Sequence, residues 1–338
     1  MPSASAPTLE SVAARAGVSR ATAGRVLAGS ARVSPGAREA VLRAAAELSY
    51  VPNQAARSLV TRRSGSVALV VVEPVERFFN DSYFPLVLTG AQAQLAEREV
   101  QLVLVVLSTA RERERFERYA RGGHVDGAIL VSVHGRDPLP QHLADAGIPV
   151  VMSGQPLDPA STVPYVSADN VGGARTATRH LLERGCRRVV TVTGPMDMRV
   201  GQDRLAGFRE ELRAQRHRFS AELAESGDFT VAGGRAATEA LLARVPDLDG
   251  VFAANDLMAA GVLQALAAAG LAVPGRVRVV GFDDAPMASA ATPPLTTVRQ
   301  PVVEMGRELA RMLLAVIDGE APAAPVVAPT ELVERATS

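Results

Sequence analysis

The stretch TLESVAARAGVSRATAGRVLA, residues 8–28, contains two short helical patterns joined by a tight turn. Thr8 is a suitable cap for the first helix, and Gly17 follows that helix as a stop signal. Apolar residues three and four positions apart would form its buried face: Leu9, Val12, Ala13 and Ala16. Ser19 can cap the second helix. Two short helices linked so tightly, with small and apolar side chains to fill a shared core, are typical of a helix-turn-helix motif.

Residues 34–65 predict one more helix and then a segment that lacks a core of its own. A helix is expected from Ser34, with Pro35 at its first position. Its predicted buried side consists of Val41, Leu42, Ala45 and Leu48. Segment 51–65 begins another short helix at Pro52 and has too few apolar residues to bury it. A helix of about two turns is marginal alone in water, so this segment should fold only against a partner surface.

Charge separates the N-terminal region from the rest of the chain. The whole sequence has 36 basic and 36 acidic residues, and none of the basic residues is Lys. Residues 1–63 contain nine Arg and three Glu, which gives a net charge of +6 and leaves −6 on the remainder. A basic head on a larger acidic body favours a polyanionic partner such as nucleic acid. The alternative is a solvated arginine-rich surface.

From residue 66 onward, apolar runs alternate with helical patterns, which predicts an α/β core. The first set of runs is 66–72, 100–106, 126–132 and 148–152, and the second is 187–193, 249–254 and 277–282. Continuous apolar runs indicate parallel strands covered by helices on both faces. Because the two sets share an element order, we predict two doubly wound subdomains with a ligand cleft between them.

Several classes of protein lack support in the sequence. The single Cys186 excludes an intramolecular disulfide framework and a paired-thiol zinc site. A secretory h-region and an apolar run of eighteen residues are both missing, so we expect a cytoplasmic protein without a membrane span. The chain has no GxGxxG, GxSxG or HExxH motif, and its five His show no metal-ligand spacing. We therefore predict neither enzymatic activity nor a metal or cofactor.

Five segments at characteristic spacing resemble the lactose-repressor/galactose-repressor (LacI/GalR) family of bacterial transcription regulators, over nearly the whole chain. They are residues 8–34, YVPNQAARSL (50–59), VFAANDLMAAG (251–261), VVGFDD (279–284) and PPLTTVRQP (293–301). The resemblance implies a helix-turn-helix DNA-binding head at 1–50, a hinge helix and linker at 51–65, and a periplasmic-binding-protein-like core at 66–338. The core would comprise one subdomain of about 66–166 with 300–324, and another of 167–299 with 325–338.

The resemblance also implies which residues meet operator DNA. They are Ser19, Arg20, Ala21, Thr22 and Arg25 in the head, and Asn53, Ala56 and Leu59 in the hinge. An arginine fork can bond O6 and N7 of guanine, which contributes about 1–3 kcal/mol of discrimination. Ser19 and Thr22 match positions that contact phosphates. Leu59 would wedge open a base step in the minor groove, or alternatively pack against the hinge helix of a second subunit.

Two departures from the family pattern fall on the recognition helix, Arg20 to Ala28. Gly24 stands where the family has a phosphate-binding Ser, and Ala28 replaces a polar Asn. A glycine inside a helix costs about 1 kcal/mol relative to alanine. These changes predict operator binding that is weaker, or more dependent on an effector, than in a typical member.

The effector positions implied by the resemblance combine polar groups with aromatic rings, as a sugar or nucleobase site requires. They are Tyr83, Phe84, Asp169, Arg204, Phe229, Asn255, Asp256 and Asp283. An alternative for Arg204 is an ion pair with Asp169 that joins the subdomains. Of Asn255 and Asp256, one should cap a helix while the other binds ligand, and Phe229 should be partly structural. Polar loop residues offer further contacts for an oligosaccharide: Glu73, Glu76, Asp197, Arg199 and Asp203.

These features together predict a repressor whose operator affinity responds to a small molecule, which we expect to be a mono- or oligosaccharide. Two cores would form a homodimer that places two heads on a pseudo-palindromic operator. A missing heptad tail favours a dimer over a tetramer. The runner-up interpretation is a solute-binding protein with the same core and no DNA function, which the basic head disfavours.

Overall fold

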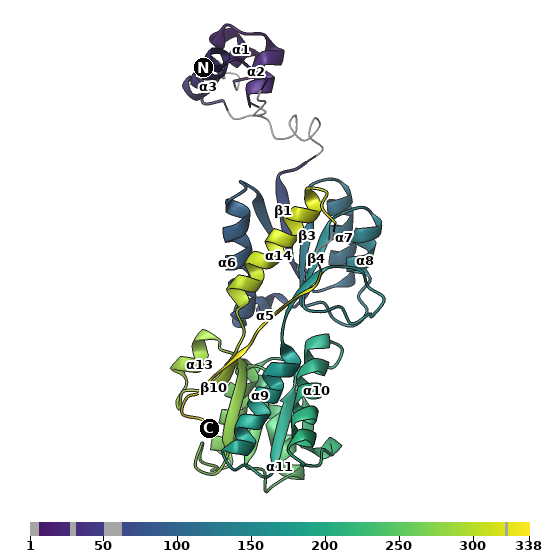
Figure 1. Ribbon diagram of the computed structural model, residues 1–338, viewed down its shortest axis with the longest axis vertical. Coiled ribbons are helices and arrows are strands. Elements are labelled where there is room, and N and C mark those ends of the chain that lie inside the picture. Colours follow the sequence, from purple (N-terminus) through teal and green to yellow (C-terminus); the bar gives the residue numbers. More distant parts are fainter. Residues whose placement is uncertain (1–6, 28–31, 51–62, 322–323) are drawn as a thin grey trace. The chain divides into compact units, whose positions relative to one another are not determined.

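The computed structural model describes residues 7–27, 32–50, 63–321 and 324–338. The chain divides into two compact units, residues 1–65 and 66–338 (Figure 1). Within the described ranges, we find no helix with the length and apolar character needed to cross a membrane.

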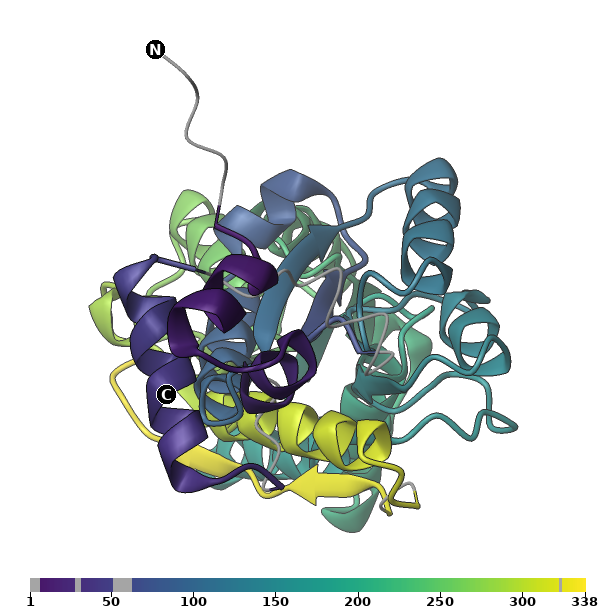
Figure 2. The ribbon, with the colours of Figure 1, turned by 90° about the horizontal axis from the view of Figure 1, so that it is seen from above.

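The head is a bundle of three helices, drawn in purple in Figure 2: α1 (Leu9–Ala16), α2 (Arg20–Leu27) and α3 (Pro35–Glu47). The Thr8 side chain accepts from the amide of Ser11, whose own side chain accepts from the amide of Thr8, so a capping box starts α1. Gly17 ends α1 in the left-handed conformation with φ 66°. The buried residues that join the three helices are Val12, Ala13, Ala23, Val26, Val41, Ala44 and Ala45.

One residue of the predicted head core is misplaced. Leu42 was expected to be buried and is 52% exposed. Val41 and Ala45 are buried and Leu48 is partly buried, which defines the inner stripe of α3 at positions i, i+4 and i+7. Leu42 follows Val41 by one residue and is therefore rotated by about 100° away from that stripe.

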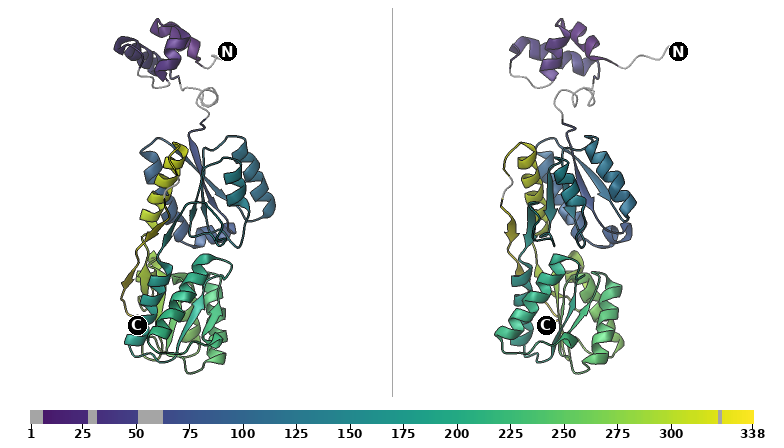
Figure 3. Two further views of the ribbon diagram at one scale, coloured as in Figure 1. Left: turned by 45° about the vertical axis from the view of Figure 1, so that its right-hand side comes forward. Right: turned by 90° about the vertical axis from the view of Figure 1, so that its right-hand side faces the viewer.

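The first subdomain contains a six-stranded parallel sheet in the order β11-β5-β4-β3-β1-β2. Its strands are β1 (Ser66–Val71), β2 (Gln101–Val106), β3 (Ala128–Val131), β4 (Val150–Ser153), β5 (Tyr165–Ala168) and β11 (Val326–Ala328). Its helices are α5 (Val75–Asn80), α6 (Tyr83–Ala96), α7 (Ala110–Arg121), α8 (Leu139–Asp145) and α14 (Val302–Ile317). Helices α6 and α14 cover one face, and α7 and α8 cover the other (Figure 3).

Coverage of both faces explains the continuous apolar runs of the sequence. In β1, Val67 and Leu69 pack beneath α6 and α14, whereas Ala68 and Val70 pack beneath α7 and α8. Both sides of the strand therefore require apolar residues. Helices α6 and α14 approach closely, because a Cβ added at Gly90 would lie 1.9 Å from the carbonyl oxygen of Val303.

The second subdomain has a six-stranded sheet in the order β12-β10-β9-β8-β6-β7, parallel except for the pairing of β12 with β10. Its strands are β6 (Val189–Thr193), β7 (Ala224–Ser226), β8 (Gly250–Ala253), β9 (Arg278–Asp283), β10 (Thr296–Arg299) and β12 (Glu331–Val333). Its helices are α9 (Asn170–Glu183), α10 (Arg199–Ala214), α11 (Val231–Arg244), α12 (Asp256–Ala268), α13 (Pro286–Ala290) and the 3₁₀ turn Ala221–Leu223.

The chain passes between the two sheets three times: from β5 to α9, from β10 to α14, and from β11 to β12. The last passage differs from the expectation that residues 325–338 belong wholly to the second subdomain. Val326–Ala328 pairs with β5 at the edge of the first sheet, and the chain then crosses at Pro329 and Thr330. A strand of three residues lacks the length from which periodicity could assign it to a sheet.

Candidate functional site

Two chambers lie between the subdomains, at the carboxyl ends of the strands of both sheets. The inner chamber has a volume of about 90 Å³ and the outer chamber about 1040 Å³. Arg77, Asp81 and Phe229 line both chambers, so the chambers adjoin. Carboxyl ends of parallel strands are the usual place for ligands in such sheets.

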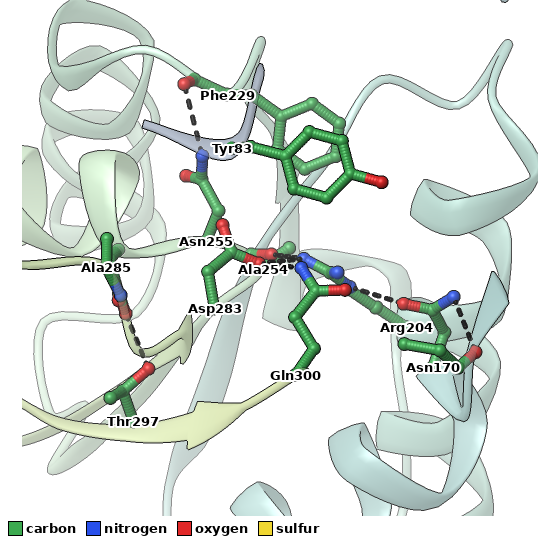
Figure 4. Close-up of polar contacts among 12 residues, drawn as sticks. Tyr83, Asn170, Arg204, Phe229, Ala254, Asn255, Asp283, Ala285, Thr297 and Gln300 are labelled. Atoms are coloured by element: carbon green, nitrogen blue, oxygen red, sulfur yellow. Dashed lines mark hydrogen bonds and ion pairs between the residues drawn. The ribbon is translucent and has the colours of Figure 1, made fainter. Parts of the chain in front are cut away.

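Arg204 of α10 lines the inner chamber, and several contacts hold its guanidinium in place (Figure 4). Its side chain is 4% exposed and donates from Nε to Asn170 Oδ1 at 2.9 Å. Its Nη1 donates to the carbonyl oxygen of Ala254 and to Asp283 Oδ1, the latter at 3.4 Å. The guanidinium also stacks on the Phe282 ring at 3.6 Å from the centroid. These contacts hold the fork in place before any ligand arrives.

Asp283 faces Arg204 from the end of β9. Its Oδ1 also accepts from Gln300 Nε2 at 2.6 Å. Burial raises the pKa of Asp283 to about 7, against the opposing charge of Arg204. Its φ of 116° is unusual for a residue other than glycine, and Phe229 and Ser132, which also line the chambers, have φ of 63° and 60°. Such strained backbone clusters at ligand sites.

The raised pKa of Asp283 predicts a pH dependence of stability. The folded core binds a proton at Asp283 between about pH 4 and pH 7 that the unfolded chain releases, so this carboxyl makes the fold less stable as pH rises through that range. Asp283→Asn should remove the effect. The free energy of unfolding of the variant minus that of the parent should therefore increase by up to about 4 kcal/mol from pH 4 to pH 8. Urea unfolding midpoints of both chains across this range would measure it, and parallel profiles would contradict it.

Asp169, expected to contact the effector, lies outside both chambers. Its Oδ1 accepts from the amide of Gly172 at 2.8 Å and so caps α9. The following residue, Asn170, lines the inner chamber and binds Arg204 instead. The alternative ion pair between Arg204 and Asp169 is therefore wrong, because the cap turns the Asp169 carboxylate back towards its own helix.

Asn255 and Asp256 divide their roles differently from the expectation of one cap and one ligand. Asn255 caps α12 through its bond from the Met258 amide at 2.9 Å, and it also lines the inner chamber. Its Nδ2 donates to the carbonyl oxygen of Phe229 at 3.2 Å. Asp256 lies outside the chambers and accepts from Thr297 Oγ1 at 2.5 Å and from the Ala285 amide at 2.7 Å. Burial raises the pKa of Asp256.

The aromatic residues line the chambers to different degrees. Tyr83 Oη lies 2.7 Å from Ser153 Oγ, which joins the start of α6 to the end of β4. Phe84 is almost wholly buried and stacks against Phe78 at 6.0 Å between ring centroids, so it is largely structural. The Phe229 ring lines both chambers and lies 5.2 Å from the Arg77 guanidinium.

Every arginine that lines the chambers is already paired with a carboxylate. Arg77 pairs with Glu73 at 2.6 Å, Arg199 with Asp203 at 2.7 Å, and Arg204 with Asp283 at 3.4 Å. Further acidic groups line the same space: Glu76, Asp81, Asp197 and Asp228. The cleft therefore has more negative than positive charge and offers an anionic ligand no unpaired arginine among its described lining residues.

Sequence reasoning missed several residues of the cleft: Ser132, His134, Ser153, Gln155, Asn170 and Gln300. All six lie at the end of a strand or within three residues after one. Ser132 follows β3, for example, and Gln300 follows β10. Position after a strand was a usable signal, but the residue types are common in ordinary loops.

In the head, the predicted DNA-contacting residues lie on α2 and at its N-terminal cap. Arg20, Ala21 and Arg25 are exposed, and Arg20 pairs with Glu10 at 2.9 Å. Ser19 Oγ accepts from the Thr22 amide at 3.1 Å and so caps this helix. The hinge positions Asn53, Ala56 and Leu59 lie outside the described residues, as does Ala28.

Gly24→Ser should strengthen operator binding by about fivefold to tenfold. A Cβ at Gly24 would meet only Leu9 Cδ2, at 3.7 Å, so the substitution fits. Serine removes part of the helix cost of about 1 kcal/mol and adds a hydroxyl that can bond a phosphate. Fluorescence anisotropy with a labelled operator at fixed salt would measure the gain. Gly24→Ala is the control, because it changes helix propensity without the hydroxyl; no gain for serine over alanine would contradict the phosphate contact.

Known proteins resemble this chain along most of its length. Residues 8–53 match the model of bacterial regulatory proteins of the lacI family, and residues 178–338 match a periplasmic binding protein-like domain. The HTH-type transcriptional regulator CelR of Thermobifida fusca is 50% identical over 93% of each chain. A ribose operon repressor of Halalkalibacterium halodurans is 35% identical over 92% of this chain and 90% of the repressor.

Solved structures agree with these matches. A complex of transcriptional regulator CelR with cellobiose is 46% identical, with a TM-score of 0.80 over 98% of this chain and 100% of that one. The lac repressor dimer bound to operator and the anti-inducer ONPF is 25% identical, with a TM-score of 0.84 over 98% of each chain. These relatives are transcriptional regulators rather than enzymes.

Proposed function

Because this chain belongs to the lacI family of bacterial regulatory proteins, we propose that it represses transcription from an operator and that a neutral sugar in its cleft controls the repression. It is a DNA-binding transcriptional regulator with a helical head and a two-subdomain core. The observation that carries the sugar assignment is the cleft itself, in which fixed polar groups and aromatic rings from both subdomains converge on one chamber.

The charges of the cleft favour an uncharged saccharide, and its volume can hold two or more sugar units. A phosphate or carboxylate on the ligand would meet excess acidic groups and no unpaired arginine among those described. The inner chamber of about 90 Å³ adjoins the outer chamber of about 1040 Å³, so the cleft has room for a saccharide that extends from one chamber into the other. Cellobiose, the sugar in the CelR complex, is the first candidate.

We assign effector contacts to Tyr83, Arg204, Phe229, Asn255 and Asp283. The Arg204 fork is suited to vicinal hydroxyls, and Asp283 is suited to accept from a hydroxyl or, when protonated, to donate to one. Asn170 and Gln300 orient these two groups from either side. Phe84, Asp169 and Asp256 keep structural roles.

We assign base contacts to Arg20, Ala21 and Arg25 and phosphate contacts to Ser19 and Thr22, with the hinge residues Asn53, Ala56 and Leu59 in the minor groove. Two copies of the chain form a dimer that presents two heads to a pseudo-palindromic operator in the cytoplasm. Sugar in the cleft changes the angle between the subdomains and so changes operator affinity, with a coupling free energy typical of such systems, about 1–3 kcal/mol.

A titration of the full chain with the DNA upstream of its own gene tests this function. We expect preferential binding over random duplex at fixed salt, and a shift in affinity of about fivefold to 150-fold on addition of cellobiose. At 100 times its dissociation constant, cellobiose should also stabilise the chain by about 2.7 kcal/mol. A chain that binds sugar but has no preference for any promoter fragment would be a solute-binding protein instead.

A further inference from the structure

His134 connects the two subdomains at the outer chamber. It follows β3 in the first subdomain, and its Nε2 lies 3.0 Å from Glu73 Oε1. Its Nδ1 lies 3.0 Å from Oδ2 of Asp197, which precedes α10 in the second subdomain. The amide of Gly135 donates to the Asp197 carbonyl oxygen at 2.7 Å. His134 and Asp197 thus connect the two subdomains, and both residues line the outer chamber.

The chemistry of this bridge depends on the protonation of His134. An ionised carboxylate only accepts hydrogen bonds, and a neutral imidazole has one N–H to donate. A ring with one carboxylate on each nitrogen can therefore satisfy both only as the imidazolium. The hydrogen bond to Glu73 raises the pKa of His134, and the bond to Asp197 adds to this, whereas partial burial opposes it.

The groups around the bridge keep the Glu73 carboxylate ionised. Glu73 is 5% exposed and also accepts from Arg77 Nη1 and Ser132 Oγ, each at 2.6 Å. Burial alone would raise the pKa of Glu73, but the bond from His134 and the charge of Arg77 lower it below its usual value. The other charged groups among the described residues that line the outer chamber are Glu76, Asp81 and Asp228, all acidic.

We propose that His134 is a positioning residue that holds the sugar cleft closed by a charged bridge between Glu73 and Asp197, so that effector affinity falls when His134 loses its proton. This inference rests on the proposed function and adds to it a control that acts through subdomain closure. The closed state binds a proton at His134 more tightly than the open state does. The free energy that favours closure is therefore present at low pH and is lost as the pH rises through the pKa of His134 in the closed state.

Calorimetric titration of the full chain with cellobiose at pH 5.5, 6.5, 7.5 and 8.5 tests the affinity. We expect the parent chain to lose about tenfold in affinity across this range, the equivalent of one pKa unit. His134→Gln keeps the size and polarity of the side chain without its charge. Its affinity for cellobiose should retain only the part of the pH dependence that comes from Asp283. Asp197→Asn should match it, and the double variant should be no weaker than either single variant.

Some outcomes of the titration would overturn the proposal. A His134→Gln profile that coincides with that of the parent at every pH would show that the bridge has no part in affinity. Loss of binding in His134→Gln by the same factor at every pH, without a similar effect of Asp197→Asn, would make His134 a direct sugar ligand instead of a positioning residue.

A measurement without ligand separates this inference from the identity of the effector. Glu114 of α7 and Arg213 of α10 are exposed, one on each subdomain, and Cys186 is buried, so cysteines introduced at these two positions can be labelled for energy transfer. The distance between the labels should increase from pH 5.5 to pH 8.5 in the parent and stay constant in His134→Gln. If the distance between the labels in the parent does not change with pH, the bridge is refuted, even if cellobiose binds. If the distance increases with pH, the bridge is supported, even if cellobiose is not the effector.

Discussion

Arg204→Ala should weaken cellobiose binding by more than about 100-fold and abolish the response of operator binding to the sugar. The variant removes the fork that spans Asn170, Ala254 and Asp283, and it leaves Asp283 buried without its charged partner. Removing one member of a buried ion pair costs about 3–5 kcal/mol, so the core should also unfold at lower denaturant concentration. Operator titrations with and without sugar measure the response, and urea unfolding measures the stability.

Two further variants separate ligand binding from folding. Arg204→Lys keeps the positive charge beside Asp283 and loses the bidentate fork, so it should fold and still bind sugar poorly. Asp169→Asn is the matched control outside the cleft, because Asn also caps helices well, and it should respond to sugar like the parent. A parent-like sugar response in a folded Arg204→Lys would exclude Arg204 as an effector contact.

Arg25→Ala should reduce affinity for the specific operator by about 10-fold to 100-fold and relax its selectivity for one base pair. Arg25 is exposed on α2, and its Nε donates only to the Ala21 carbonyl oxygen of its own helix among the bonds described, so the fork is available to a guanine edge. A bidentate contact of this kind contributes about 1–3 kcal/mol. Competition between operator and single-base variants measures the loss of selectivity.

The control for Arg25 is another exposed arginine of the same head. Arg15 belongs to α1 and pairs with Glu47 of α3 at 2.7 Å. Arg15→Ala changes the net charge equally but should alter specific and random duplex binding by the same small factor. If Arg25→Ala also weakened both to the same extent, Arg25 would be a phosphate contact and not a reader of sequence.

The sequence predicted the fold well because its strongest signals come from burial. Strand β1 is covered on both faces, so nearly every residue in it is apolar and the run is continuous. Caps such as Thr8 and Asn255 indicate where helices start, because each side chain accepts a hydrogen bond from a backbone amide three residues further along the chain. Leu42 and β11 were misassigned because one lies next to the buried stripe of its helix and the other is three residues long.

The cleft was less predictable, because its side chains are arranged by contacts between distant segments. A family position pointed to Asp169, but whether that carboxylate faces the cleft or its own helix depends on the Gly172 amide. Gln300 and Asn170 serve the site only because Asp283 and Arg204 lie between them. His134 carries no signal in the sequence at all, since its two partners are 61 and 63 residues away.

The three chain passages between the sheets determine how an effector can be sensed. Two subdomains connected by a single segment could reorient almost freely, and part of the binding free energy of a ligand would be lost in ordering them. We expect three connections between the same two sheets to restrict their relative motion mainly to one rotation. We therefore expect a bound effector to change mainly one angle between the subdomains, and the DNA-binding head of the same chain to respond to that angle.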